Sequence, residues 1–175
     1  MSLPEKCVVD TNVPKTANLA LAPRQDSDVP ESCISACIAV IEHVREKRCL
    51  VIDAGDEIYD EYRRQLLMKG QPGVGDSFMK WVHDHRWSLP ESQRVNITKN
   101  GDSYDEFPAS VDLASFDKAD MKFVAVANAH EEKPPILQAV DHKWWGWKDA
   151  LAEAGVTVQF LCPDYTEKKY AKKIR

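Results

Sequence analysis

The 175-residue chain has no apolar run that approaches the length needed to cross a membrane. Its first thirty residues also lack the order of basic, apolar and small residues that marks a signal peptide. We therefore expect a cytoplasmic protein with no membrane partner. Internal repeats and low-complexity tracts are absent too, and 43% of the residues are hydrophobic. This composition predicts one folded domain with a substantial core.

The sequence also lacks a CxxC pair. Its five cysteines lie inside or beside apolar runs, at positions 7, 33, 37, 49 and 162. This placement favours buried thiols over disulfides or a zinc site.

Positive charge is scarce, with 23 Lys and Arg against 28 Asp and Glu and a net charge of -5. This balance argues against a simple basic groove for nucleic acid. The last eight residues, KKYAKKIR, carry five positive charges, and removing those five charges from -5 leaves -10 for the rest. We place a domain at residues 1–163 and a basic C-terminal tail at residues 164–175. The tail is interpreted as a solvated, frayed terminus, with an arm that contacts phosphates as the alternative.

Strand-like and helix-like segments alternate along the chain. Apolar runs predict strands at residues 7–9, 49–52, 94–98, 135–140 and 156–161. Helical spacing predicts helices at residues 30–46, 56–68, 76–85, 117–129 and 143–154, with a weak helix or loop at 13–22, a loop at 70–75 and a polar turn at 99–106. Asp56 and Asp117 are placed to cap two of these helices. Strands separated by helices require crossovers, so we expect an α/β fold with a parallel central sheet and helices on both faces.

Two aspartates directly follow predicted strands. Asp10 and Asp141 should therefore lie at the carboxyl edge of the sheet, where such folds bind ligands. Asp120 lies in the first turn of a helix that leads into the strand before Asp141, on the helix face that points toward the sheet. Glu61 lies at the inner margin of its own helix and is the expected contribution from the second strand. The pattern predicts four carboxylates near one point.

Carboxylates gathered in this way repel each other at neutral pH unless a cation holds them. A ligand set of oxygen atoms without His or Cys suits Mg²⁺ or Mn²⁺. Such a site is suited to phosphodiester hydrolysis, because the metal lowers the pKa of a bound water and neutralises charge on the leaving oxygen.

Four stretches, in the order CVVDTNV, IYDEYRRQL, DKADMKFVAVA and ILQAVD, resemble the PIN domain family. PIN domains are metal-dependent nucleases found in bacterial toxin-antitoxin ribonucleases and in RNA-processing factors. The resemblance spans about residues 7–162. It implies a three-layer α/β/α sandwich with a mostly parallel sheet of order 3-2-1-4-5, one or two Mg²⁺ or Mn²⁺ ions, and RNA as the substrate.

The resemblance also assigns residues to the site. The family's catalytic and metal-binding acids fall on Asp10, Glu61, Asp120 and Asp141. Residues expected to support the site or to contact substrate are Thr11, Asn12, Asp117, His142 and Lys143. The implied function is a metal-dependent endoribonuclease, with a toxin of a toxin-antitoxin pair as the more specific form. Its candidate protein partners are an inhibitor protein (antitoxin) and a second copy of the chain in a homodimer.

The match departs from the family after Asp141, where many relatives carry a further acid and this chain has His142 and Lys143. The number of metal ions is therefore open. A PIN-like binding module without catalysis, for RNA or a protein partner, is the alternative function. A phosphatase with an aspartyl nucleophile would also use a strand-end aspartate, but position 12 holds Asn12 where such enzymes carry a second aspartate.

Several candidate residues have structural alternatives. Asp10 and Asp141 could begin turns or cap helices, and Asp120 could share a capping arrangement with Asp117. Acids at positions 53, 57 and 60 compete with Glu61 for the second ligand position. Tryptophans at positions 144, 145 and 147 could stack unpaired bases, although core packing is the more common role of large aromatic side chains.

Overall fold

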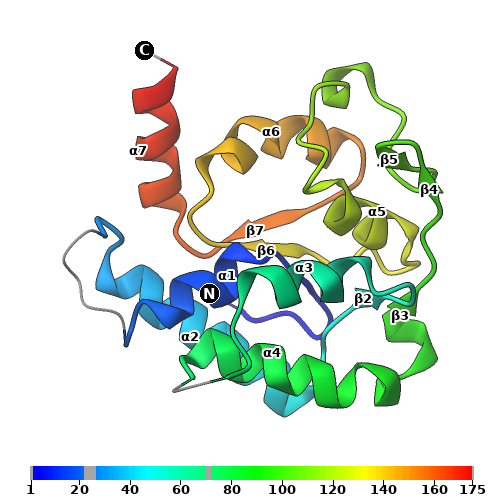
Figure 1. Cartoon of the computed structure of the whole chain (residues 1–175). Helices are drawn as coiled ribbons and strands as arrows, with labels where there is room; N and C mark the ends of the chain where they lie inside the picture. The colour runs from blue at the N-terminus through cyan, green and yellow to red at the C-terminus, as the bar shows by residue number, and fades with distance from the viewer. Residues whose placement is uncertain (1, 22–26, 70–71, 175) are drawn as a thin grey trace.

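The computed structural model describes residues 2–21, 27–69 and 72–174. In this part of the chain the α-helices are α1 (Asn12–Asn18), α2 (Glu31–Lys47), α3 (Glu57–Gln65), α4 (Val74–His85), α5 (Met121–Ala129), α6 (His142–Glu153) and α7 (Pro163–Lys173), drawn in Figure 1. The strands are β1 (Val8–Val9), β2 (Ile52–Asp53), β3 (Arg94–Val95), β4 (Lys99–Asn100), β5 (Ser103–Tyr104), β6 (Ile136–Gln138) and β7 (Val158–Phe160). Short 3-10 turns lie at Arg86–Ser88, Glu91–Gln93 and Val111–Leu113.

The strands outside the β4-β5 hairpin are parallel. β1, β6 and β7 form one three-stranded sheet in the order β1-β6-β7, and β2 pairs with β3 in a second sheet. An isolated parallel bridge joins Cys7 to Leu50, and the N–H of Val51 donates to the carbonyl of Cys7 at 2.8 Å. The expected mixture of helices with parallel strands is confirmed.

The strands and helices bury the apolar positions that their patterns predict. In β1 and β6, Val8, Val9, Ile136 and Leu137 are at most 1% exposed. Helix α2 buries a stripe at spacings of three and four residues, as expected for one helix face packed on a core. Figure 1 shows α5 and α6 above the strands and α2 and α4 below them. This arrangement leaves the ends of the parallel strands as the place where loops meet.

Helix α3 is capped differently from the prediction. The carboxylate of Asp53, at the end of β2, accepts hydrogen bonds from the N–H groups of Glu57 (2.7 Å) and Ile58 (2.9 Å). Asp56, the expected cap, has a positive φ of 65° and binds Arg86 at 3.0 Å instead. The prediction for Asp56 is wrong because the strand-end aspartate reaches the same two donors.

Two other helix starts also differ from prediction. Helix α5 begins at Met121, and Asp117 accepts from the N–H of Ala119 at 3.1 Å in the turn before it. Helix α4 begins at Val74, so the predicted loop is wrong at residues 74–75, while residues 70–71 lie outside the described part.

The basic tail is helical rather than frayed. Helix α7 runs to Lys173 and starts with Pro163, a residue suited to the first helical turn because it lacks an N–H to satisfy. Thr166 is fully buried, and Lys169 pairs with Asp28 at 3.0 Å. The tail therefore packs on the domain. Of the helices in the described residues, none is long and apolar enough to cross a membrane.

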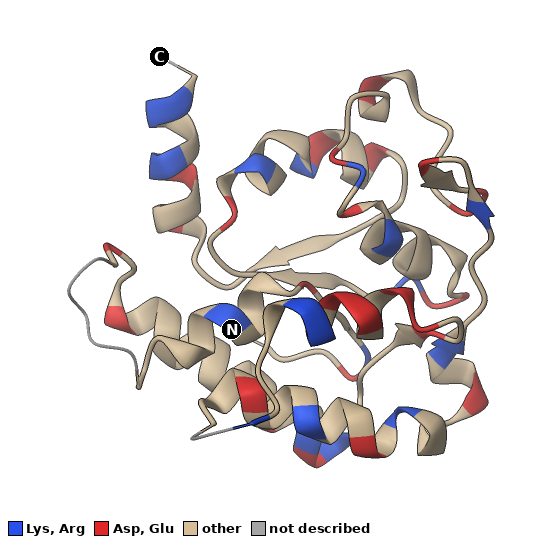
Figure 2. Cartoon of the chain, in the orientation of Figure 1, with Lys and Arg blue, Asp and Glu red and all other residues tan. Residues whose placement is uncertain are grey.

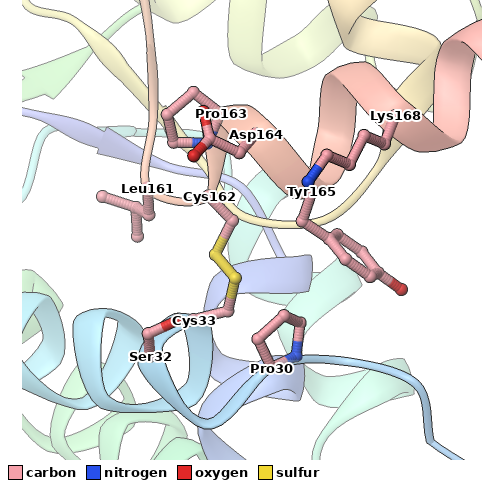
Figure 3. A pocket seen from close by; sticks show the side chains of 9 residues that line it. All are labelled: Pro30, Ser32, Cys33, Leu161, Cys162, Pro163, Asp164, Tyr165 and Lys168. Carbon is pink, nitrogen blue, oxygen red and sulfur yellow. A yellow bond between two sulfur atoms is a disulfide. The ribbon is translucent and has the colours of Figure 1, made fainter.

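The cysteine prediction is right for three residues and wrong for two. Cys7, Cys37 and Cys49 are buried free thiols. Cys33 and Cys162 form a disulfide, with Cα atoms 5.4 Å apart, within the range that a bridge requires. Figure 3 shows this bond joining α2 to the start of α7 beside a pocket of about 400 Å³. The partners are 129 residues apart, so their spacing could not reveal the bond.

The contact between α1 and α4 generates a test of the packing. A Cβ atom on Gly75 would lie 1.9 Å from the carbonyl oxygen of Pro14, which is backbone and cannot rotate away. We expect Gly75→Ala to destabilise the protein by about 1 to 3 kcal/mol, the usual cost of overpacking. Gly55→Ala is the matched control, because its Cβ would meet its nearest neighbour at an ordinary 3.5 Å. Urea unfolding measures both, and equal midpoints would contradict the α1-α4 packing.

Candidate functional site

Asp10 lies at the buried carboxyl end of β1. The strand before it is inaccessible to solvent, and Asp10 itself is 3% exposed. Its N–H donates to the carbonyl of Leu137 at 3.1 Å, which extends the β1-β6 pairing. Its Oδ1 atom accepts from the N–H of Asn12 at 2.9 Å. Asp10 thus begins a turn, and its carboxylate is held in place as the chain leaves the sheet.

The side chain of Asn12 joins this turn to the end of β6. Its Oδ1 atom accepts from the N–H groups of Ala139 (2.9 Å) and Val140 (3.3 Å). Those two residues lead directly to Asp141. The bonds therefore hold the segments that carry Asp10 and Asp141 side by side.

Glu61 contacts the same turn from α3. The hydroxyl of Thr11 donates to Glu61 Oε1 at 2.7 Å. The Nζ atom of Lys122, on α5, forms an ion pair with Glu61 Oε2 and also donates to the carbonyl of Ala119. Glu61 consequently links β1, α3 and α5.

The acids that compete with Glu61 in the sequence have other partners. Asp53 caps α3, and Glu57 accepts from the hydroxyl of Tyr104 at 3.0 Å. Asp60 is exposed. Among these four acids, Glu61 is the one bonded to the turn that follows β1.

Asp120 occupies the N-cap position of α5 without making a side-chain cap bond. Burial raises its pKa to about 7, with further contributions from the charges of Asp117, Asp141 and Glu61, while Lys122 opposes the shift. Because its side chain makes no cap bond, Asp120 does not act as the side-chain cap of α5.

The pKa of Asp10 is raised well above the ordinary aspartate value, first by burial and then by the charge of Asp120. The N–H of Asn12 lowers it, and the charges of Glu61 and Asp141 raise it. All four predicted acids thus lie near enough to influence ionisation at one site. Each ionised member makes the next proton harder to remove.

Asp141 also caps helix α6, the structural role expected from its position. Its Oδ1 atom accepts from the N–H of Lys143 at 2.9 Å and caps α6. The side chain of Lys143 pairs with Asp117 at 3.1 Å, and this bond lowers the pKa of Asp117. His142 is partly buried at the start of α6. Burial and the charge of Lys173 lower its pKa.

The chemistry of this acid cluster fits a hard divalent cation, because its donors are carboxylate oxygens and two of its members are buried with raised pKa values. Within residues 2–21, 27–69 and 72–174, however, no group of three or more His, Cys, Asp and Glu side chains is placed where it could hold a metal ion. Glu61 is bonded to Thr11 and Lys122, and Asp141 caps a helix. An incoming ion would have to take over some of these bonds.

Lys122 is the site residue that the sequence patterns did not predict. It is 6% exposed, although lysine is almost never fully buried without a partner. One signal for it exists in the sequence, since Lys122 is a lone charge within MKFVAVA, an otherwise apolar stretch of α5. A charge in such a position points to a buried counter-ion.

No family model, no curated protein and no solved structure matches this chain. The resemblance to PIN domains therefore stays a prediction from the four sequence motifs.

The raised pKa values predict how stability depends on pH. Between the unfolded aspartate pKa of about 4 and the folded value of about 7, Asp120 keeps a proton in the folded chain that it loses in the unfolded chain. Stability should therefore fall as pH rises through this window. A loss of about 1 kcal/mol corresponds to a melting temperature lower by roughly 2 to 4 °C for a protein of this size.

Thermal melts in metal-free buffer at several pH values test this prediction. Asp120→Asn should flatten the dependence, because asparagine stays neutral, whereas Asp149→Asn on the exposed surface should not. Mn²⁺ should raise the melting temperature more at the upper end of the window than at the lower end. At higher pH fewer protons compete with the ion for the carboxylates. A pH dependence that is the same in Asp120→Asn and in the parent would contradict the proposed ionisation.

Proposed function

We propose that this chain is a divalent-metal-dependent endoribonuclease of the PIN type that hydrolyses RNA phosphodiester bonds. The observation that carries the proposal is the convergence of Asp10, Glu61, Asp120 and Asp141, from well-separated parts of the chain, on one electrostatically linked cluster. Burying several carboxylates together is costly because their charges repel each other, and a bound cation would reduce that repulsion.

The arrangement of the strands supports the same family. The bridge between Cys7 and Leu50 lies between the two parallel sheets. Followed through this bridge, the strand order becomes β3-β2-β1-β6-β7, which corresponds to the order 3-2-1-4-5 expected from the motifs. Helices on both sides of the strands in Figure 1 are in keeping with a three-layer α/β/α sandwich.

Each residue of the cluster has a proposed role. Asp10, Asp120, Asp141 and Glu61 would hold Mg²⁺ or Mn²⁺. When bound, that ion supplies a Lewis acid for the phosphodiester. In the metal-free chain the pKa of Asp120 is about 7, so a proton competes with the ion for this carboxylate near neutral pH. Thr11 orients the Glu61 carboxylate, and the Lys122 ammonium offsets its charge.

The more specific expectations rest on the motifs alone. They are a toxin of a toxin-antitoxin pair, an antitoxin or a second copy of the chain as the protein partner, and a cytoplasmic location. We propose each of them because the PIN resemblance implies it.

One observation favours the second candidate, a PIN-like binding module without catalysis. The ammonium of Lys122 already pairs with Glu61, so part of the negative charge is balanced without a metal. A module of this kind would keep the fold and bind RNA or a protein without cutting.

An RNA cleavage assay separates the two candidates. The parent protein should cut single-stranded RNA with Mn²⁺ and should stop cutting when EDTA is added. Asp10→Asn should reduce the rate by at least about a hundredfold, since loss of even a supporting partner of a metal ligand costs roughly 10- to 100-fold. Asp149→Asn removes a carboxylate that is 84% exposed and should leave the rate unchanged.

Equal cleavage by Asp10→Asn and the parent would show that the cluster does not carry the reaction. RNA binding by the parent without cleavage, at any divalent ion, would favour the binding module.

A further inference from the structure

A groove of about 620 Å³ lies between α6 and the basic helix α7. Its lining residues are Ser115, Asp117, Lys143, Gly146, Trp147 and Tyr170. We refer to it as the α6-α7 groove. It is separate from the pocket beside the disulfide, which shares none of these residues.

Two aromatic rings line the groove. Trp147 is partly buried, and its ring lies against Phe116 with centroids 5.8 Å apart. Tyr170 approaches α6 at Gly146, where an added Cβ atom would lie 2.7 Å from the Tyr170 ring. Glycine at position 146 therefore allows the tyrosine ring to rest directly on the helix. The result is a groove with one ring anchored on the core and another resting on α6.

The groove borders the acid cluster. Lys143 and Asp117 form the ion pair on its lining, with a distance of 3.1 Å. Asp117 is joined to the cluster through its carbonyl, which accepts from the N–H of Asp120 at 3.0 Å. Lys143 is joined to it through its N–H, which donates to Asp141 at 2.9 Å. An RNA strand bound at the acid cluster could therefore continue into the adjoining α6-α7 groove.

Lys143 supplies the positive charge in the lining of this groove. Figure 2 shows both basic and acidic positions on α6 and α7. Helix α7 carries acids as well as lysines. Its Lys168 lines the pocket beside the disulfide and its Lys169 pairs with Asp28, which leaves Lys172 and Lys173 as the exposed lysines that follow Tyr170. Lys143 has a side chain that is 57% exposed and can leave Asp117 for a phosphate at little cost. An aromatic groove with an exposed lysine in its lining is complementary to a base attached to a sugar-phosphate chain.

We propose that the α6-α7 groove binds one unpaired base of the RNA strand beside the bond that is cut, with the rings of Tyr170 and Trp147 as its stacking surfaces. This inference rests on the proposed function, because it names how that site holds its substrate. Lys143 in the groove, with Lys172 and Lys173 of α7, then contacts the adjoining phosphates. Without its last eight residues the chain has a net charge of -10, so base stacking supplies affinity that a broad basic surface would otherwise provide.

Fluorescence anisotropy with a short labelled oligoadenylate, in EDTA to prevent cleavage, tests the proposal. Tyr170→Leu should weaken binding about tenfold, in line with the stacking contribution of one base. Tyr170→Phe keeps the ring and should retain binding. Trp87→Ala is the control, because Trp87 is 57% exposed and lies outside the groove. Circular dichroism verifies that each variant is folded.

A second probe changes the ligand instead of the protein. An oligonucleotide of the same length with abasic residues should bind the parent protein about as weakly as the intact oligonucleotide binds Tyr170→Leu. It should also lose nothing further in that variant. Equal affinity of the parent for the intact and abasic probes, or equal binding of the intact probe by Tyr170→Leu and the parent, would overturn the base site.

The two proposals fail in different ways. RNA that is cut in an Asp10-dependent manner but bound without regard to Tyr170 overturns the base site and leaves the nuclease intact. Base-dependent binding with no cleavage at any divalent ion supports the groove and overturns the nuclease. Failure to bind or cut RNA at all overturns both.

Discussion

The repulsion among carboxylates at the buried end of β1 is the constraint on which this structure depends. Asp10 is almost inaccessible to water and receives the influence of Glu61, Asp120 and Asp141. An uncompensated charge in such a place is costly, so the protein must supply donors, counter-ions or protons. The N–H of Asn12, the ammonium of Lys122 and the raised pKa of Asp120 are three such responses.

These responses also hold the elements around the site together. Asn12 bonds the turn after β1 to the end of β6, and Thr11 bonds it to α3 through Glu61. Lys122 extends the same network to α5. Packing of the apolar strands positions the carboxyl end of the sheet. Polar side chains then hold the segments around that end in place by hydrogen bonds and an ion pair. Fold and site are therefore linked through one short segment, CVVDTN.

Local patterns predicted the parts of this arrangement that depend on local spacing. The buried stripe of α2 and the position of Asp10 at the end of β1 follow from periodicity and from the direction of parallel strands. Asp141 does not follow its strand directly, because β6 ends at Gln138 and Asp141 caps α6. The contact of Glu61 with the β1 turn also follows from its helix face. Partners that are distant in sequence were not predictable in this way. The bond between Cys33 and Cys162 and the pairing of Lys122 with Glu61 arise only when the chain has folded.

Titration calorimetry of Mn²⁺ into the metal-free protein at a pH above 7 tests the central claim most directly, because it measures whether the acid cluster takes up a cation. We expect saturable binding to the parent and loss of that binding in Asp10→Asn, with Asp149→Asn unchanged. Absence of binding to the parent, or equal binding to Asp10→Asn, would contradict a shared cation site at the end of β1.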